Sequence, residues 1–274
     1  MSATLPVIGV FDSGFGGLTV LRALLSLVPS ERYVYLGDTA RLPYGSKSRE
    51  TIVRYALSSA QFLAQQGADL LVIACNTATA LALEDIQAAL PIPVVGVIDP
   101  GAHAAAEAEG SSQVLVLATA ATTQSGAYTR ALNALGLQAT EKACPLLVPL
   151  VEEGWLEQPV YKSVTLEVLR IYLIEALAQT PSADTLLLGC THYPLLKSLI
   201  ETTLSTLRHP MRIIDSAEAT ARAVATLLPH ATEASETSPL CEFYATDSVE
   251  KFQRLGSVFL GRSLDDVKLL DLGG

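Results

Sequence analysis

Short apolar runs recur along the chain, and polar or glycine-containing segments separate them. An apolar run of strand length that is bounded by turn residues is typical of a strand buried on both faces of a sheet. The runs that we expect to form strands cover residues 6–11, 32–36, 70–74, 94–98, 113–118, 138–143, 185–189, 211–215 and 241–245. Strands buried in this way indicate parallel sheets.

Amphipathic stretches of helical length lie between most of these runs. The clearest covers residues 48–66, because Ser48 is a favourable N-cap and Gly67 a favourable stop. The other stretches that we expect to form helices cover residues 122–135, 160–178, 195–207 and 217–228. A short polar loop is expected at residues 232–239. Strands that alternate with helices build βαβ units, so the pattern predicts an α/β protein with mainly parallel sheets.

One short pattern occurs twice in the chain. Residues 68–75, with the sequence ADLLVIAC, align without a gap on residues 183–190, with the sequence ADTLLLGC. Each copy is a strand-like run that ends at a cysteine, Cys75 or Cys190, and short polar residues follow it. In open α/β sheets, ligands bind outside the carboxyl ends of the strands. The repeat therefore predicts two similar lobes whose cysteines line a cleft from opposite sides, with a boundary near residues 99–101.

Composition restricts the class of protein further. The chain has 274 residues, 50% of them hydrophobic, and a mean hydropathy of +0.37, which suits an α/β protein long enough for two domains. No apolar run reaches the ~18 residues of a spanning helix, and the first residues lack the basic start of a secretory signal. The net charge of −10 disfavours nucleic acids and anionic membranes as partners. We therefore expect a cytoplasmic protein.

The two matched cysteines differ in setting from the other two. A lone cysteine at the end of a buried strand is usually a small core residue, and Cys144 and Cys241 keep that interpretation. Cys75 and Cys190 occupy equivalent places beside polar residues, which favours catalysis. A disulfide framework is not expected in a cytosolic chain of this size. His192 lies two residues after Cys190 and is able to stabilise a thiolate, whereas no further residues at metal-ligand spacing support a metal site.

Other strand ends carry small polar residues that suit a carboxylate ligand. Hydroxyls and backbone N–H groups at helix N-termini bind carboxylates, and Thr119 with Thr122 offers such a position. The first strand ends in Asp12 and Ser13 and is followed by glycines, which allow a close approach of the backbone. This segment matches neither a P-loop nor a dinucleotide fingerprint. Its alternative interpretation is a tight turn between a strand and a helix.

Two further segments have a structural and a functional interpretation. The loop at residues 37–46 is either a plain turn or a site loop that offers Tyr44 and backbone donors above the cleft. Glu152 and Glu153 are by default the solvated end of a helix. The residues alone leave these alternatives open.

Taken together, these motifs resemble those of the glutamate racemases, cofactor-independent enzymes that make D-glutamate for the bacterial cell wall. The matching segments are FDSGFGG at residues 11–17, GDTARLPYG at 37–45, CNTA at 75–78, LGCTHYPL at 188–195 and IDSA at 214–217. They occur in order over nearly the whole chain, and the two cysteine motifs together are highly specific.

The resemblance has consequences for the fold and the assembly. It implies two pseudo-symmetric flavodoxin-like lobes, with the last segment of the chain returning to the first lobe. The lobes expected on this basis are residues 1–98 with 210–274, and residues 99–209. The resemblance also implies a homodimer, a reaction without a cofactor or metal, and glutamate as the small-molecule substrate, with no role for nucleic acid or membrane.

The resemblance also assigns roles to single residues. Cys75 would exchange the Cα proton on the D-glutamate side and Cys190 on the L-glutamate side. Asp12 would assist the first thiol and His192 the second. Glu152 matches a further site carboxylate, although the next residue is also a glutamate. The residues implied to hold the substrate are Asp12, Ser13, Pro43, Tyr44, Gly45, Cys75, Asn76, Thr77, Thr119, Thr122, Cys190, Thr191 and His192.

Inversion at Cα requires the breaking of a C–H bond that is a very weak acid. Many racemases obtain an electron sink from pyridoxal phosphate bound to a lysine. No lysine lies in the strand-end motifs of this chain, and Lys47 is the nearest. Two thiols offer a route without a cofactor, because one as thiolate removes a proton while the opposite thiol delivers another. Hydrogen-bond donors around the α-carboxylate would stabilise the charge that develops.

Three other functions are compatible with the same residues. A related racemase could act on aspartate, a hydantoin or another small acid, because sequence spacing does not fix the depth of a pocket. A two-lobed binding protein for a small acid would use the cysteines only for packing. A cysteine hydrolase would leave the second matched thiol without a role.

Overall fold

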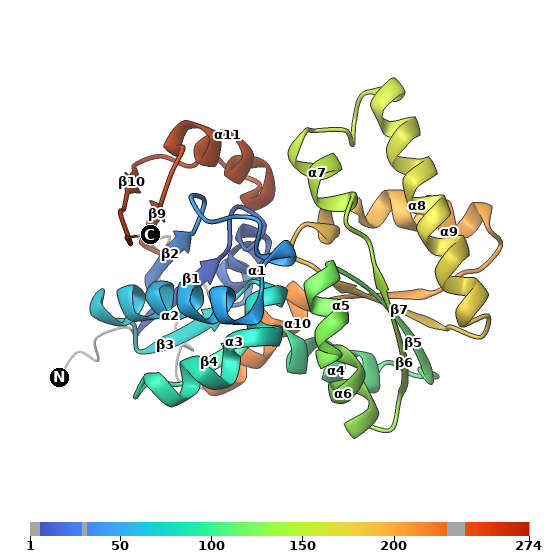
Figure 1. The fold of residues 1–274 in the computed structure, drawn as a ribbon, viewed down its shortest axis with the longest axis horizontal. Coiled ribbons are helices and arrows are strands. Elements are labelled where there is room, and N and C mark those ends of the chain that lie inside the picture. The colour runs from blue at the N-terminus through green and yellow to red at the C-terminus, as the bar shows by residue number, and fades with distance from the viewer. Residues whose placement is uncertain (1–5, 29–31, 229–238, 274) are drawn as a thin grey trace. The chain divides into compact units, whose positions relative to one another are not determined.

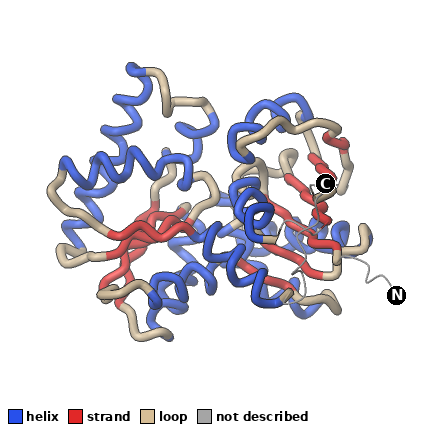
Figure 2. Tube along the Cα trace, turned by 180° about the vertical axis from the view of Figure 1, so that it is seen from behind, coloured by secondary structure: helices blue, strands red, loops and turns tan. Residues whose placement is uncertain are grey.

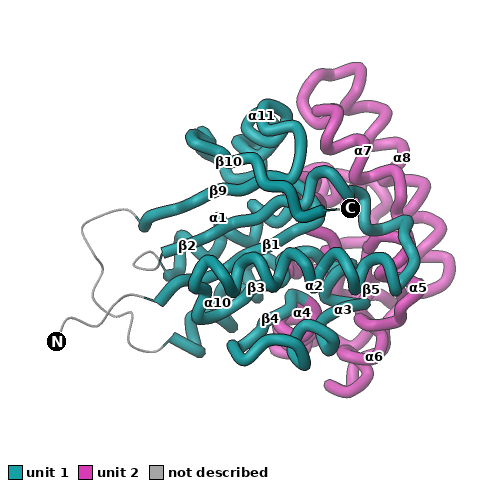
Figure 3. The backbone as a smooth tube through the Cα atoms, turned by 60° about the vertical axis from the view of Figure 1, so that its left-hand side comes forward, with its two compact units in different colours: residues 1–97, 217–274 teal, residues 98–216 magenta. Residues whose placement is uncertain are grey.

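The computed structural model describes residues 6–28, 32–228 and 239–273 (Figure 1). Each of its two sheets is flanked by helices (Figure 2), and the predicted α/β fold with mainly parallel sheets is confirmed. Contacts divide the chain into unit 1, residues 1–97 with 217–274, and unit 2, residues 98–216 (Figure 3). The polar loop expected at residues 232–239 lies almost entirely outside the described residues.

Unit 1 is built on a six-stranded sheet in the order β10-β9-β2-β1-β3-β4. All neighbouring strands in this sheet pair in parallel. The strands are β1 (Val7–Asp12), β2 (Arg32–Gly37), β3 (Leu70–Ile73), β4 (Val94–Gly96), β9 (Cys241–Ala245) and β10 (Val267–Leu269). Strand β3 is buried along its whole length, which explains its continuous apolar sequence.

Unit 2 is built on a four-stranded sheet in the order β6-β5-β7-β8, also parallel throughout. The strands are β5 (Gln113–Ala118), β6 (Gln138–Ala143), β7 (Thr185–Gly189) and β8 (Arg212–Asp215). This order repeats the order β2-β1-β3-β4 of unit 1, with β7 in the place of β3. The two strands that precede the matched cysteines therefore hold equivalent positions, and unit 1 differs by the added strands β9 and β10.

Helices connect the strands of each unit. In unit 1 they are α1 (Leu18–Leu27), the 3-10 helix η1 (Tyr44–Ser46), α2 (Arg49–Gln65), α3 (Asn76–Ala89), α10 (Ser216–Leu227), which begins at the last residue of unit 2, and α11 (Val249–Leu260). In unit 2 they are α4 (Ile98–Glu107), α5 (Ala120–Ser125), α6 (Ala127–Ala134), α7 (Leu147–Glu152), α8 (Pro159–Gln179), the 3-10 helix η2 (Tyr193–Leu196) and α9 (Lys197–Thr206).

The elements differ from the expected ones in several places, and the helices α1, α3, α4, α7 and α11 were not among those expected. Strand β10 was not expected, because its short run lies among aspartates. The helix expected at residues 122–135 is divided into α5 and α6 at Gly126, whose φ of 64° interrupts a right-handed helix. The helix expected at residues 195–207 begins instead with the 3-10 turn η2. Every other expected strand and helix is present, with small differences at its ends.

The second lobe boundary also differs from the expected one. The sequence-based boundary at residue 210 precedes β8 and would place that strand in the first lobe. In the structure β8 pairs with β7, with Leu187 opposite Ile214, so it belongs to the sheet of unit 2. The pairing partner of an edge strand is a property of the folded chain and is not encoded in the strand's own pattern.

Each copy of the repeated pattern has an aspartate at its second position, and this residue binds the neighbouring strand. In unit 1 the carboxylate of Asp69 accepts a hydrogen bond from the N–H of Val7 at 2.8 Å. In unit 2 the carboxylate of Asp184 accepts hydrogen bonds from the N–H groups of Ser112 and Gln113 at 3.0 and 3.1 Å. These contacts favour one register between each cysteine strand and β1 or β5, so the carboxyl ends of the paired strands meet at the same edge.

An ion-pair cluster joins the added strands to the rest of the unit 1 sheet. Glu242 of β9 pairs with Arg32 of β2 and, at 3.0 Å, with Lys268 of β10. The hydrogen bond from Arg32, followed by that from Lys268, lowers the pKa of Glu242 to about 2. Because a depressed carboxyl pKa favours the folded state only where the group is ionised, this contribution is present above the unfolded pKa of about 4.3 and is lost between about pH 4 and 2.

We expect Glu242→Gln to weaken the dependence of the unfolding free energy on pH in the acid range, between about pH 4 and 2. The variant should lose about 1 kcal/mol of unfolding free energy at pH 7, because the partly exposed pair is screened by solvent, and it should converge with the wild type near pH 2. Urea unfolding measured from pH 2 to 7 tests this. Glu250→Gln, at an exposed glutamate of α11, is the control. A constant difference between wild type and Glu242→Gln at all pH values would contradict the assignment.

Candidate active site

Cys75 lies between β3 and α3, where its side chain caps the helix. Its Sγ accepts a hydrogen bond from the N–H of Ala78 at 3.4 Å and lies 3.5 Å from Oγ of Ser13, to which the thiol donates. The residue is only 6% exposed. Asn76 and Thr77 form the first turn of α3 and are also buried. The thiol is therefore held at the carboxyl end of the sheet, beside the hydroxyl that follows β1.

Asp12 ends β1, the strand that pairs with β3, so it reaches the same edge of the sheet as Cys75. Its carboxylate accepts a hydrogen bond from the N–H of Gly14 at 3.0 Å and is fully buried. Burial raises the pKa of the Cys75 thiol to about 12, and the negative charge of Asp12 adds to the shift. Hydrogen bonds with Ser13 and Ala78 oppose it. The free protein therefore holds Cys75 as a thiol at neutral pH.

Gly17 allows the close packing around Asp12. A Cβ atom at this position would lie 2.5 Å from Cβ of Asp12 and 2.8 Å from the hydroxyl of Tyr35. That hydroxyl donates a hydrogen bond to the carbonyl of Gly14 at 3.2 Å. Burial, and secondly the charge of Asp12, raises the pKa of Tyr35 well above its usual value, so the phenol stays protonated. The glycine run after β1 thus makes room for the protein's own side chains.

The loop after β2 places Tyr44 inside unit 1. Its ring is 1% exposed and belongs to the same apolar cluster as Cys75. The hydroxyl donates a hydrogen bond to Asp38 at 2.5 Å, and burial, followed by the Asp38 charge, raises the pKa of Tyr44 above its usual value. Pro43 is exposed and joined to Leu42 by a cis peptide bond. The phenol of Tyr44 is therefore committed to Asp38.

Cys190 lies directly after β7 in unit 2 and is followed by Thr191 and His192. Nδ1 of His192 lies 4.0 Å from Sγ of Cys190 and 3.5 Å from Oγ1 of Thr191. Nε2 of the same ring lies 3.2 Å from Oε1 of Glu152, at the end of α7. The three residues from 190 to 192 are each less than a tenth exposed. The imidazole thus bridges a thiol and a carboxylate.

Of the two adjacent glutamates, Glu152 contacts the histidine, whereas Glu153 is exposed. The interpretation as a solvated helix end therefore applies to Glu153 only. This link was not derivable from spacing, because α7 and the residue after β7 meet only through tertiary packing.

Thr119 and Thr122 occupy the end of β5, the counterpart of β1. Oγ1 of Thr119 accepts a hydrogen bond from the N–H of Thr122 at 3.3 Å and caps α5. The two hydroxyl oxygens lie 3.0 Å apart. By strand register, Thr119 therefore stands where unit 1 has Ser13, and Ala118 stands where unit 1 has Asp12.

The structure groups the expected site residues into two sets, one in each unit. The set in unit 1 is Asp12, Ser13, Pro43, Tyr44, Gly45, Cys75, Asn76 and Thr77. The set in unit 2 is Thr119, Thr122, Glu152, Cys190, Thr191 and His192. Each set contains one thiol beside a second group that can exchange a proton. Sequence reasoning did not identify Asp38 and Tyr35, although a buried aspartate directly after a strand was a usable signal at residue 38.

Two further findings concern the described residues. They contain no group of three or more His, Cys, Asp and Glu side chains arranged to hold a metal ion. In the same part of the chain, no helix combines the length and the apolar character needed to cross a membrane.

The sequence and the fold are both similar to those of known proteins. The family described as Asp/Glu/Hydantoin racemase matches residues 8–224. The glutamate racemase of Koribacter versatilis is 50% identical over 100% of both chains. The crystal structure of glutamate racemase from Thermus thermophilus in complex with beta-chloro-D-alanine has a TM-score of 0.84 and 42% identity, covering 98% of this chain and 97% of that one. The glutamate racemase structure from Francisella tularensis, in complex with D-glutamate, has a TM-score of 0.86 and 34% identity, with 97% and 98% coverage.

Proposed function

This chain belongs to the Asp/Glu/Hydantoin racemase family, and we propose that it is a glutamate racemase that interconverts L- and D-glutamate without a cofactor. The observation that carries the proposal is the pair of thiols at equivalent strand ends, Cys75 and Cys190. Asp12 and Ser13 lie at the strand end beside the first, and His192 with Glu152 stands beside the second. Two acid–base groups are what inversion at a single carbon requires.

In the proposed reaction both thiols act on the same bound glutamate. From L-glutamate, Cys190 as thiolate removes the Cα proton, and Cys75 as thiol delivers its proton to the opposite face. The product is D-glutamate, and the enzyme is left with Cys190 as thiol and Cys75 as thiolate. The reverse reaction starts from that state. The high pKa of Cys75 suits both roles, because it keeps the proton in the free protein and makes the thiolate a strong base.

Asp12 and His192 would tune the two thiols differently. The negative charge of Asp12 disfavours the Cys75 thiolate, which raises its basicity. A bound substrate's ammonium group would offset that charge and allow the thiolate to form when glutamate is present. His192, supported by Glu152, would stabilise the Cys190 thiolate as an imidazolium partner. The unlike partners predict unlike kinetics in the two directions.

The remaining residues of both sets would hold the substrate. We propose that Ser13, Asn76, Thr77, Thr119, Thr122 and Thr191 bind its carboxylates and amino group. Pro43, Tyr44 and Gly45 would contribute with backbone groups, because the Tyr44 phenol is hydrogen-bonded to Asp38. Donors placed around the α-carboxylate would stabilise the charge that develops as Cα loses its proton.

We further propose a cellular role and an assembly. D-Glutamate made by this enzyme would be used in peptidoglycan synthesis, in the cytoplasm, and the enzyme would act as a homodimer with no nucleic-acid or membrane partner. The relatives named glutamate racemase support the first of these inferences.

The direct test is to incubate the purified chain with L-glutamate in deuterated water and follow optical rotation and Cα deuteration. We expect the rotation to fall to zero and the D-enantiomer to carry deuterium at Cα. The same assay with aspartate and other small acids separates glutamate specificity from that of a related racemase. Binding of glutamate without any Cα deuteration would contradict racemase activity and would indicate a binding protein instead.

Glu152→Gln tests whether the carboxylate acts through His192. We expect kcat to fall about 10-fold, less than for loss of a group that itself transfers the proton, because glutamine keeps a hydrogen bond and loses the charge. The fall should be larger with L-glutamate as substrate. Glu153→Gln, at the adjacent exposed glutamate, is the matched control and should keep wild-type activity. Equal effects of the two substitutions would contradict the assigned role of Glu152.

A further inference from the structure

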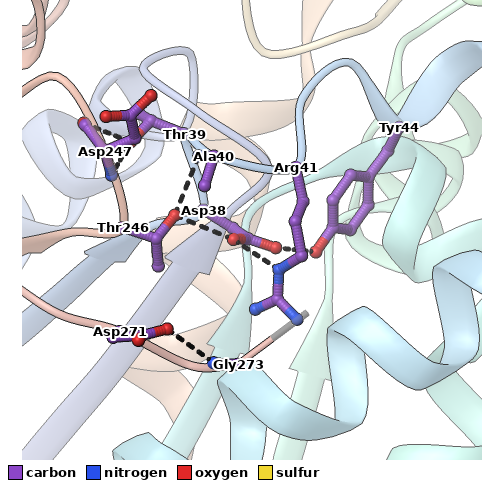
Figure 4. Close-up of polar contacts among 9 residues, drawn as sticks. All are labelled: Asp38, Thr39, Ala40, Arg41, Tyr44, Thr246, Asp247, Asp271 and Gly273. Atoms are coloured by element: carbon purple, nitrogen blue, oxygen red, sulfur yellow. Dashed lines mark hydrogen bonds and ion pairs between the residues drawn. The ribbon is translucent and has the colours of Figure 1, made fainter.

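Asp38, at the end of β2, carries a buried carboxylate that accepts three side-chain hydrogen bonds (Figure 4). Nε of Arg41 and Oγ1 of Thr246 donate to Oδ1, each at 2.9 Å. The hydroxyl of Tyr44 donates to Oδ2 at 2.5 Å. A buried carboxylate requires such partners, because desolvation without them is costly. Its orientation, and that of Tyr44, therefore depends on all three donors.

Thr246 stands out among these donors because it comes from the far end of the sequence. It follows β9 and reaches the loop after β2 across the parallel β2–β9 pair. Its hydroxyl donates to Asp38 and accepts a hydrogen bond from the N–H of Ala40 at 2.9 Å. The next residue makes a reciprocal contact, in which the N–H of Asp247 donates to Oγ1 of Thr39 at 2.8 Å and that hydroxyl donates to the carbonyl of Asp247 at 2.6 Å.

This loop is connected directly to the proposed catalytic strand end. The N–H of Asp38 donates a hydrogen bond to the carbonyl of Asp12 at 3.0 Å. The side chain of the same aspartate holds Tyr44, the middle residue of the segment proposed to bind glutamate. Asp38 thus connects the position of Asp12 with that of the loop at residues 43–45. Thr246 in turn binds Asp38 from a different part of the chain.

Thr246 belongs to the part of unit 1 that has no counterpart in unit 2. Strands β9 and β10 extend the unit 1 sheet beyond β2, whereas the sheet of unit 2 ends at β6, the counterpart of β2. The hydrogen bond from Thr246, which follows the added strand β9, is therefore specific to unit 1. Unit 1 also carries the loop at residues 43–45.

We propose that Thr246 is a positioning residue for the reaction, which holds Asp38 and through it Tyr44, so that the loop at residues 43–45 keeps the conformation that binds the amino acid. The inference rests on the proposed function. A hydroxyl is needed at this position because one atom both donates to Asp38 and accepts from the backbone of Ala40. Valine has nearly the same shape and can do neither.

Thr246→Val is the decisive variant, and Thr246→Ser restores the hydroxyl. We expect the valine variant to raise KM about 10-fold for both glutamate enantiomers while kcat changes less than about threefold, because small displacements of binding groups have large effects. The serine variant should return KM to within about twofold of wild type. Thr226→Val is the control, since that exposed hydroxyl donates a hydrogen bond to the carbonyl of Ala223 in its own helix α10.

A purely structural role for Thr246 gives a different result. It would lower the thermal midpoint and the active fraction, and thus kcat, while KM stayed at the wild-type value, and that result would overturn the proposal. Thr246→Ala replaces the valine variant if the latter does not yield folded protein. An inactive wild-type chain would refute the proposed racemase function instead, so the two failures are distinguishable.

Tyr44→Phe probes the same connection from its other end. It removes the hydroxyl that binds Asp38 and keeps the buried ring. We expect it to raise KM by a factor similar to that of Thr246→Val, and the double variant to show less than the product of the two factors. If the KM of the double variant rose by the full product of the two factors, the two residues would act independently. That result would contradict an effect of both residues through Asp38.

Discussion

Replacement of Cys75 or Cys190 by alanine is expected to lower racemisation of glutamate by about 1,000-fold or more in both directions. In the proposed mechanism each thiol is required in every turnover, as base in one direction and as acid in the other, so the loss of either one should stop both directions. The loss should appear in kcat, because alanine removes the reacting atom and leaves the proposed carboxylate contacts in place. The measurement is the change of optical rotation with each pure enantiomer.

Deuterated water makes the same experiment more specific. A variant with one remaining thiol can still remove a proton from the enantiomer that this thiol faces and return a deuteron to the same side. We expect any residual Cα deuteration in Cys75→Ala to be confined to L-glutamate, and in Cys190→Ala to D-glutamate, each without inversion. Racemisation at the wild-type rate in either variant would refute the two-thiol mechanism.

The remaining cysteines provide a control in each unit. Cys241→Ala changes a partly buried thiol in β9, and Cys144→Ala a buried one in unit 2. Burial raises the pKa of Cys144 to about 12 as well, so a raised thiol pKa alone does not identify a catalytic cysteine. Both controls should keep kcat within about threefold of wild type when folded, because general acid–base roles are worth far more.

Asp12→Asn and His192→Asn are expected to slow the two directions unequally. Asp12 is proposed to act on the thiol that accepts the proton from D-glutamate, so its loss should lower kcat for D-glutamate by about 100-fold and kcat for L-glutamate less. His192→Asn should show the opposite preference, because the imidazole lies 4.0 Å from Cys190. Steady-state assays of both directions on each variant measure this.

Equilibrium restricts how such an asymmetry can appear. The enantiomers have equal free energies in water, so kcat/KM must be the same in both directions for every variant. A larger loss of kcat with one substrate must therefore be accompanied by an equal fall in the ratio of its KM to the KM of the other enantiomer. Equal losses of kcat for both substrates in both variants would show that the two thiols do not have separate partners.

Much of the fold followed from the pattern along the chain. Apolar runs of strand length predicted the parallel strands, and the repeat at residues 68–75 and 183–190 predicted equivalent positions for the cysteines. The repeat holds this information because its first half is structural, with Asp69 and Asp184 binding the neighbouring strand, and its second half carries the chemistry. Local patterning and the ends of parallel strands are both determined by short-range rules.

Contacts between distant segments were not predictable in this way. The pair of His192 with Glu152 depends on where α7 packs, and the hydrogen bond of Thr246 with Asp38 depends on β9 pairing with β2. Strand β8 is a further example, because its apolar residues predict a strand but do not predict which sheet it joins. Side-chain pairing across such separations results from packing, which no local pattern contains.

The divided composition of unit 1 has a consequence for biosynthesis. A ribosome completes the continuous segment of unit 2 before it has made β9, so unit 2 is able to fold while β2 still presents an unpaired edge. Residues 43–45 emerge before unit 2, whereas the threonine that tethers their loop is translated after it. During synthesis the loop at residues 43–45 therefore gains this hydrogen-bonded tether only after the whole of unit 2 has been translated.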